Sequence, residues 1–192
     1  MHTRRESGLP IPSRRVEKRQ TSSISGAALY WVTGLPGAGK TTLARELAQR
    51  LRQRGESVVL LDGDALRTVL GGKHGYDYAA RFELAMIYVR LCRLLCEQGH
   101  TVVCATVSMF EEVRQWARSN IAGYSEIFVR APEGVLRERR ALYRSSISPE
   151  LMVDSNPRYE LPVAPHAILD NDGSRPPAAL VDELLNLIQR LS

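Results

Sequence analysis

The chain of 192 residues is 44% hydrophobic and 24% charged, which fits one globular domain and excludes a globally disordered protein. No apolar run approaches the roughly 18–20 residues that a membrane-spanning helix needs, so no membrane partner is expected. The net charge of +5 is concentrated in residues 1–28, where six Lys or Arg and two Glu give +4 and leave +1 for the rest. A nearly neutral body lacks the basic face that nucleic-acid binding requires.

The first 27 residues form a segment rich in Arg, Ser and Pro, with few large apolar side chains. This composition predicts a disordered basic tail, because such a segment cannot bury enough apolar surface to fold. Contact with a polyanion is one alternative for the tail. A transit peptide is another, although Glu6 and Glu17 argue against it. The tail lacks the apolar core of a secretion signal, so we expect a cytoplasmic protein.

After the tail, short apolar runs alternate with longer helical patterns. Strands are predicted at 28–33, 57–61, 101–106, 125–129 and 166–169, and helices at 41–54, 79–98, 111–120, 132–143 and 177–191. The strands are apolar on both faces, which is typical of a parallel sheet covered on both sides. The alternation predicts an α/β domain with a doubly wound, mostly parallel five-stranded sheet. Ligands of such sheets bind beyond the carboxyl ends of the strands.

The strongest motif is GLPGAGKT, which fits the P-loop pattern G-x-x-x-x-G-K-[ST] between a predicted strand and a predicted helix. Gly34, Gly37 and Gly39 allow the backbone to curl its N–H groups around phosphate oxygens, and the helix N-terminus adds its dipole. Lys40 is expected to reach the β- and γ-phosphates, and the Thr41 hydroxyl to bind Mg²⁺. The motif therefore predicts a P-loop NTPase fold with a nucleoside triphosphate site, against the alternative of a Gly-rich turn without a ligand.

The sequence LDGD ends the second predicted strand and puts Asp62 and Asp64 at the carboxyl edge of the sheet, where we expect them next to the P-loop strand. A kinase needs one carboxylate to accept the proton of the attacking hydroxyl and others to hold Mg²⁺. The alternative is that Asp64 only caps a helix that begins near Ala65. The chain has no N-K-x-D element, its third strand carries no D-x-x-G, and no strand ends in the D-E pair of ATPase motors, so a kinase is favoured.

The segment 144–165 interrupts the alternation with four prolines and weak periodicity. A long loop before the last strand suits a mobile lid over the site. Four arginines precede or begin this segment: Arg137, Arg139, Arg140 and Arg144. They form a cluster that suits neutralisation of a transferring phosphate, although a solvated helix face is the alternative.

With these motifs in place, the chain resembles the adenylylsulfate (APS) kinase family from about Ala28 to the C-terminus. The likeness rests on GLPGAGKTTLA, LDGDALR, a long helix ending in EQG, a third strand leading to a Ser, and FVRAPEGVLRERRALYR. Family members transfer the γ-phosphoryl group of ATP to the 3′-hydroxyl of adenosine 5′-phosphosulfate (APS). The resemblance implies a kinase domain at 28–192 that uses ATP and Mg²⁺ and acts on a small nucleotide acceptor. Members are commonly dimers, so it also implies a homodimer.

The resemblance also assigns residues. The ATP phosphates fall on Gly34, Leu35, Pro36, Gly37, Ala38, Gly39, Lys40, Thr41 and Thr42. Arg139 falls near the ATP base and the lid, and Thr41 and Asp64 are the expected Mg²⁺ ligands. Asp62 and Asp64 lie between nucleotide and acceptor, with Lys40 as a third catalytic candidate and Asp64 favoured as the base. The acceptor contacts are Arg67, Tyr76, Arg81 and Ser108, with Tyr76 in the place of a base-stacking Phe. A surface or packing role is the alternative for Arg67, Tyr76 and Arg81.

The departures from the family concentrate on the acceptor side. The family's E-N-I-R-R-I is replaced by residues 83–88, ELAMIY, so its Asn and both Arg are absent. The family's R-D-P-K-G-L-Y is shortened at 139–143, and the lid pattern K-x-F-T-G-I-D gives way to LMVD at 151–154. Each lost charge-assisted hydrogen bond to an anionic acceptor is worth about 1.5–3 kcal/mol. The wording of the long helix and of Ser108-Met109-Phe110 is similar to a divergent branch, one group of which phosphorylates cytidine diphosphoramidate in surface-polysaccharide modification.

The sequence therefore predicts an ATP-dependent kinase that phosphorylates a hydroxyl of a small nucleotide, with APS as the leading acceptor. The second candidate for the acceptor is a nucleoside diphosphate derivative such as cytidine diphosphoramidate. A nucleotide-binding regulator that has lost catalysis is the alternative of another class, and the rewritten lid motivates it.

Overall fold

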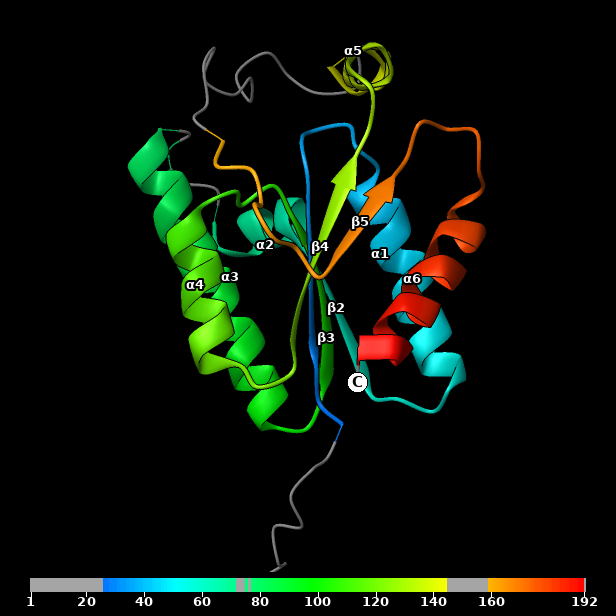
Figure 1. The fold of residues 1–192 in the computed structure, drawn as a ribbon. Helices are drawn as coiled ribbons and strands as arrows, with labels where there is room; N and C mark the ends of the chain where they lie inside the picture. The colour runs from blue at the N-terminus through cyan, green and yellow to red at the C-terminus, as the bar shows by residue number, and fades with distance from the viewer. Residues whose placement is uncertain (1–25, 72–74, 76, 145–158, 192) are drawn as a thin grey trace, which may run out of the picture.

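The computed structural model describes residues 26–191 apart from 72–74, 76 and 145–158 (Figure 1). Its strands are β1 (Leu29–Thr33), β2 (Val58–Asp62), β3 (Thr101–Thr106), β4 (Tyr124–Arg130) and β5 (Ala167–Asp170). Its helices are α1 (Lys40–Gln53), α2 (Gly63–Val69), α3 (Tyr78–Glu97), α4 (Glu111–Asn120), α5 (Glu133–Arg144) and α6 (Pro177–Leu191). Every predicted strand and helix is confirmed to within one or two residues. The predicted tail and most of the predicted lid lie outside the described residues.

The strands form one sheet in the order β2-β3-β1-β4-β5, and all of its pairings are parallel. The doubly wound α/β fold is therefore confirmed. The expectation that the second strand lies next to the P-loop strand is wrong, because β3 lies between β2 and β1. Chain order does not give strand order in a parallel sheet, since each connection crosses over a face and can skip a position.

Helices cover both faces of the sheet, with α1 and α6 on one side and α3 and α4 on the other (Figure 1). Alternate residues of β1 supply the two cores, as strand geometry requires. Leu29 and Trp31 pack with α3 and α4, while Tyr30 and Val32 pack with α1 and α6. This double burial explains why the strands read as continuous apolar runs.

The short helix α2 is not among the predicted elements, and its beginning corrects one alternative. Asp62 is the N-cap of α2, and its carboxylate accepts the Asp64 amide N–H at 3.0 Å. Capping therefore belongs to Asp62, two residues before the position expected, and Asp64 lies inside the first turn. The seven residues of α2 are too few to show a helical period. The LDGD motif, and not the hydrophobic periodicity, therefore indicated a functional turn at this position.

No helix among the described residues has the length and apolar composition that a membrane crossing would require.

Candidate active site

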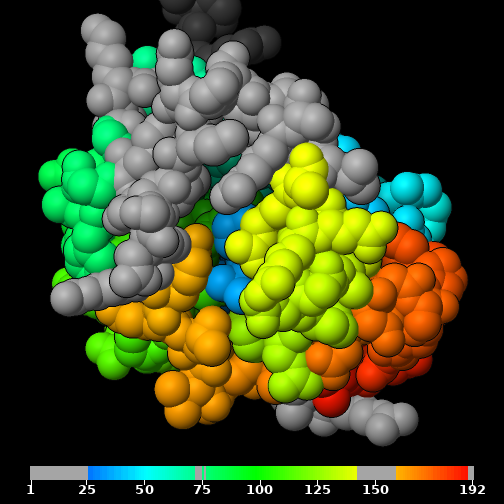
Figure 2. Space-filling view, turned by 90° about the horizontal axis from the view of Figure 1, so that it is seen from above, coloured from blue at the N-terminus to red at the C-terminus, as the bar shows by residue number. Residues whose placement is uncertain are grey.

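The loops at the carboxyl ends of the strands surround one hollow at the top of the sheet. Seen from above, atoms of the blue segment that contains β1 and the P-loop lie at the bottom of this hollow, between α5 and the orange segment that follows residue 158 (Figure 2). Parallel strands carry all their carboxyl ends to one edge, so motifs far apart in sequence meet there.

The P-loop has the conformation that its glycines permit. Gly37 and Gly39 have φ of 85° and 94°, in the left-handed region that other residues rarely adopt. A Cβ at Gly39 would also collide with the Asn171 side chain, whose Nδ2 donates to the Ala38 carbonyl at 2.8 Å. The loop ends at Lys40, the first residue of α1, so the positive end of a 14-residue helix faces the hollow. An anion is the ligand that this arrangement favours.

Lys40 is held inside the curve of the loop, where its Nζ donates to the Leu35 carbonyl at 3.1 Å. Burial lowers the pKa of Lys40 from 10.5 to about 8, although Asp64 and Asp62 favour its charged form. The ammonium thus lacks a full counter-charge in the protein alone. A bound phosphate would supply it.

The carboxylates of the LDGD turn lie beside the start of α1. The Thr41 hydroxyl donates to Asp62 Oδ2 at 2.6 Å, which links β2 to the P-loop across the intervening strand. Asp64 is exposed and lines the same pocket as Asp62, Lys40 and Thr41. Hydroxyl and carboxylate oxygens are the donors that Mg²⁺ prefers, so this donor set fits the metal.

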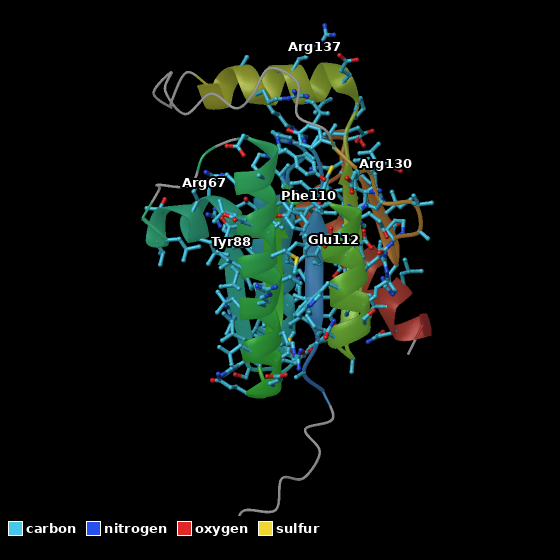
Figure 3. The ribbon with its side chains drawn as sticks, turned by 90° about the vertical axis from the view of Figure 1, so that its left-hand side faces the viewer. Arg67, Tyr88, Phe110, Glu112, Arg130 and Arg137 are labelled. Carbon is cyan, nitrogen blue, oxygen red and sulfur yellow. The ribbon has the colours of Figure 1, made fainter. Side chains whose placement is uncertain are left out.

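The phosphate pocket is the cavity around Lys40, Thr41, Asp62 and Asp64, and two arginines of α5 close its far side. Arg139 and Arg140 line it, and Arg139 Nη1 also approaches the carbonyls of Gly37 and Asn171 at 3.4 and 3.3 Å. Arg137 is 75% exposed and pairs with Glu133 on the same helix, so it points away from the pocket (Figure 3). The side chain of Arg144 lies outside the described part of the chain. Of the three predicted arginines whose side chains are described, Arg139 and Arg140 thus reach the site and Arg137 does not.

A second, adjoining cavity brings together the expected acceptor residues. This side pocket is lined by Arg67, Arg81 and Ser108, and it shares Asp64, Gly63 and Pro36 with the phosphate pocket. Arg67, Tyr88 and Phe110 lie on the elements around it (Figure 3). Tyr76 lies outside the described residues. The structure therefore gathers three of the four predicted acceptor residues beside Asp64.

Several residues of the side pocket were not predicted from the sequence. The buried Leu84 and Tyr88 of α3 form its floor, and Phe110 and Tyr159 line its wall. The Tyr88 hydroxyl donates to the Gly63 carbonyl at 3.1 Å, which fixes the LDGD turn. Burial raises the pKa of Tyr88 to about 12, so the hydroxyl stays protonated and structural. The helical spacing of Leu84 and Tyr88 indicates only a core face, which explains why these two residues were not predicted.

A further pocket next to Arg139 was also missed. Its lining combines the P-loop with the turn after β5: Gly39, Thr42, Leu43, Arg139, Asn171, Gly173, Ser174, Arg175, Pro176 and Pro177. Only Arg139 and the P-loop residues of this set were predicted. The turn residues carry no motif, but their place directly after the last strand was a usable signal.

Known proteins are similar to this chain over most of its length. Residues 26–170 match the sequence profile of the adenylylsulphate kinases. The adenylyl-sulfate kinase of Aeromonas salmonicida is 38% identical over 185 residues, covering 91% of this chain and 93% of that protein. The cytidine diphosphoramidate kinase of Campylobacter jejuni is 33% identical over 125 residues, covering 64% and 73%. A Mycobacterium tuberculosis APS kinase solved in complex with AMPPNP and APS superposes with a TM-score of 0.72 at 27% identity, covering 85% of this chain and 98% of that one.

Proposed function

The chain belongs to the adenylylsulphate kinase family, and from this premise we propose that it transfers the γ-phosphoryl group of ATP to the 3′-hydroxyl of APS. The observation that carries the proposal is the junction of the two pockets. The phosphate pocket and the side pocket meet at Gly63 and Asp64. A phosphoryl donor in one and a hydroxyl acceptor in the other would therefore face each other across a carboxylate.

Lys40 and the P-loop amides hold the donor's phosphates in this proposal. The lowered pKa of Lys40 supports it, because the ammonium regains its favourable environment when an anion binds. Arg139 and Arg140 approach from α5 and stabilise the charge on the transferring group. The turn after β5, with Asn171 and Gly173, receives the base of ATP next to Arg139.

Asp64 acts as the general base. Asp62 is engaged by the Thr41 hydroxyl and by the Asp64 amide, whereas Asp64 lines both pockets. The acceptor oxygen forms a bond to the γ-phosphorus while the bond from that phosphorus to the β,γ-bridging oxygen breaks. The hydroxyl proton passes to Asp64, and ADP leaves with the bridging oxygen.

Thr41, Asp62 and Asp64 would hold Mg²⁺, with Thr41 and Asp64 as the ligands expected from the sequence. When bound, the ion neutralises charge on the β- and γ-phosphates. The residues of the chain orient it: α2 begins at the capping carboxylate of Asp62, and α1 begins at Lys40, beside Thr41.

Arg67 and Arg81 suit the anionic group of the acceptor, since two guanidinium groups enter the side pocket. One observation favours an acceptor other than APS, for which cytidine diphosphoramidate is the second candidate. Leu84 lines the side pocket and is 2% exposed, in the segment where the family resemblance expects an Asn. An apolar floor cannot replace the hydrogen bonds of that amide, so some acceptor contacts must differ from the family pattern.

The test is Mg²⁺-ATP turnover to ADP by the full chain with APS, with cytidine diphosphoramidate and without an acceptor. We expect turnover that depends on APS. Turnover only with the cytidine compound would replace the acceptor and keep the reaction. ATP binding without turnover in any arm would exclude both acceptors, and would favour either another nucleotide acceptor or the nucleotide-binding regulator.

The homodimer and the basic tail at 1–27 stay predictions. A chain lacking residues 1–25 should turn over at the same rate, because every residue assigned a role in the reaction lies at Gly34 or beyond. ATP as the phosphoryl donor agrees with the cytoplasmic location expected from the sequence.

A further inference from the structure

Glu160 lies just after residues 145–158 and is held beside the side pocket by four hydrogen bonds, one of them to the pocket residue Met109. Its amide donates to the Met109 carbonyl at 3.0 Å, and its own carbonyl accepts from Arg114 Nη1 at 2.8 Å. Its carboxylate accepts the Glu111 amide at 2.5 Å and the Tyr78 hydroxyl at 3.2 Å. These contacts join the segment to α3, to α4 and to the loop that ends β3.

The carboxylate of Glu160 also supplies a cap that α4 lacks in its own sequence. The N-cap of α4 is Phe110, whose side chain makes no capping hydrogen bond. The first amides of a helix need acceptors, and a carboxylate there also meets the positive end of the helix. Glu160 provides this acceptor from 49 residues away in the chain. Glu160 therefore sets the beginning of α4, which directly follows the pocket residues Met109 and Phe110.

The Arg114 side chain, which donates to the Glu160 carbonyl, is itself buried and held by ion pairs. Its side chain is 1% exposed and pairs with Glu111 at 2.7 Å and with Glu126 of β4 at 3.2 Å. Glu126 is also 1% exposed and pairs with Arg118. A guanidinium fixed on two sides presents its remaining N–H to the Glu160 carbonyl in one orientation. The position of Glu160 is thus tied to the central sheet.

The residue before Glu160 is Tyr159, which lines the side pocket. The Tyr159 ring centroid lies 5.5 Å from the guanidinium carbon of Arg81. The same guanidinium carbon lies 5.7 Å from the ring centroid of Phe110. The rings of Tyr78 and Phe82 pack edge-on against Phe110 at 5.1 and 5.5 Å. Fixing Glu160 therefore fixes both aromatic rings that contact Arg81, a residue proposed to bind the acceptor nucleotide.

We propose that Glu160, held by Arg114, is a positioning residue that sets the acceptor wall of the side pocket through Tyr159, Phe110 and Arg81. The role assigned to Glu160 rests on the proposed function, because the side pocket is taken as the acceptor site. Glu160 touches neither the P-loop nor the phosphate pocket in the described structure, so its effect falls on acceptor binding rather than on ATP binding.

The experiment compares Glu160→Ala and Glu160→Gln with the wild type and with Glu112→Ala as the matched control. Glu112 is an exposed carboxylate at the same end of α4 and lies outside the lining of either pocket. Glu160 is exposed too, so neither change should prevent folding. The readouts are KM for APS, KM for ATP, kcat, and hydrogen exchange of the Glu111 amide.

We expect Glu160→Ala to raise KM for APS about tenfold, the order of one lost charge-assisted hydrogen bond in a preorganised site. KM for ATP stays within about twofold, and the Glu111 amide exchanges faster. Glu160→Gln keeps an acceptor oxygen and restores part of the APS affinity, and Glu112→Ala matches the wild type. Equal increases in both KM values, or no change in KM for APS, would overturn the positioning role.

Failure of the proposed function would look different. If the wild type uses another nucleotide acceptor, the same KM comparison is made with that acceptor and tests Glu160 unchanged. If the wild type shows no acceptor-dependent turnover with any nucleotide tested, the proposed function fails. In that case unaltered exchange of the Glu111 amide in Glu160→Ala would also overturn the anchor, and faster exchange would support it.

Discussion

Replacing Lys40 with Met should stabilise the protein without nucleotide while it removes phosphoryl transfer. Burial lowers the pKa of Lys40 from 10.5 to about 8. The folded protein binds this proton less tightly than the unfolded chain does. Below pH 8, where Lys40 is protonated in both the folded and the unfolded state, this difference lowers the free energy of unfolding. One pKa unit corresponds to about 1.4 kcal/mol, so lowering the pKa from 10.5 to about 8 sets an upper limit of about 3.5 kcal/mol on the penalty. Partial solvent contact and the lost hydrogen bond to Leu35 reduce the expected gain of Lys40→Met to about 1–2 kcal/mol.

The pH dependence of this gain has a defined sign. Between pH 8 and 10.5 the unfolded wild type binds more protons than the folded one, so wild-type stability rises with pH in this window. The variant lacks this titration, and its advantage should shrink as pH rises. Urea unfolding at pH 7 and pH 9.5 measures the difference in free energy of unfolding between the variant and the wild type. In thermal unfolding at pH 7 the variant should melt about 2–8 °C higher. Equal or lower stability of Lys40→Met at pH 7, or an advantage that grows with pH, would show that burial does not penalise the Lys40 ammonium.

Three further changes test the rest of the site. Asp64→Asn should lower kcat by about 10²–10⁴-fold with ATP binding retained, because it removes the base; turnover and ATP calorimetry measure this, and unchanged kcat would refute the assignment. Arg81→Ala should raise KM for the acceptor about tenfold or more, whereas Arg137→Ala, at an exposed side chain paired with Glu133, should not; equal effects would contradict the placement of the two arginines. Gly39→Ala should abolish ATP binding and cost about 1–2 kcal/mol of stability, because φ is 94° and Asn171 occupies the space; retained nucleotide-induced thermal stabilisation would contradict this.

The order of elements and the P-loop could be predicted because both depend on local patterns. Continuous apolar runs such as Val102 to Cys104 mark strands buried on both faces, and the P-loop is defined by glycines at fixed spacing. The strand order could not be predicted, because it depends on which crossover skips a position. The prediction that Asp62 and Asp64 lie beside the P-loop strand was wrong for that reason. Asp62 reaches Thr41 nevertheless, because all strands end at one edge.

The residues that complete the side pocket could not be predicted for a different reason. Leu84 and Tyr88 carry only the spacing of a helix core face, and Phe110 precedes α4 without a capping side chain. Glu160 caps that helix from a distant segment, and tertiary capping leaves no pattern in the local sequence. Arg67, Arg81 and Ser108 could be predicted only through the likeness to the APS kinases, and the structure brings all three to one pocket.

The most direct measurement follows the phosphoryl group itself. The full chain is incubated with Mg²⁺, APS and ATP labelled at the γ-phosphate, and the labelled product is identified by mass spectrometry and phosphorus NMR. We expect the label on the 3′-hydroxyl of APS with the wild type and not with Asp64→Asn. Label found only in inorganic phosphate, with APS unmodified, would contradict it.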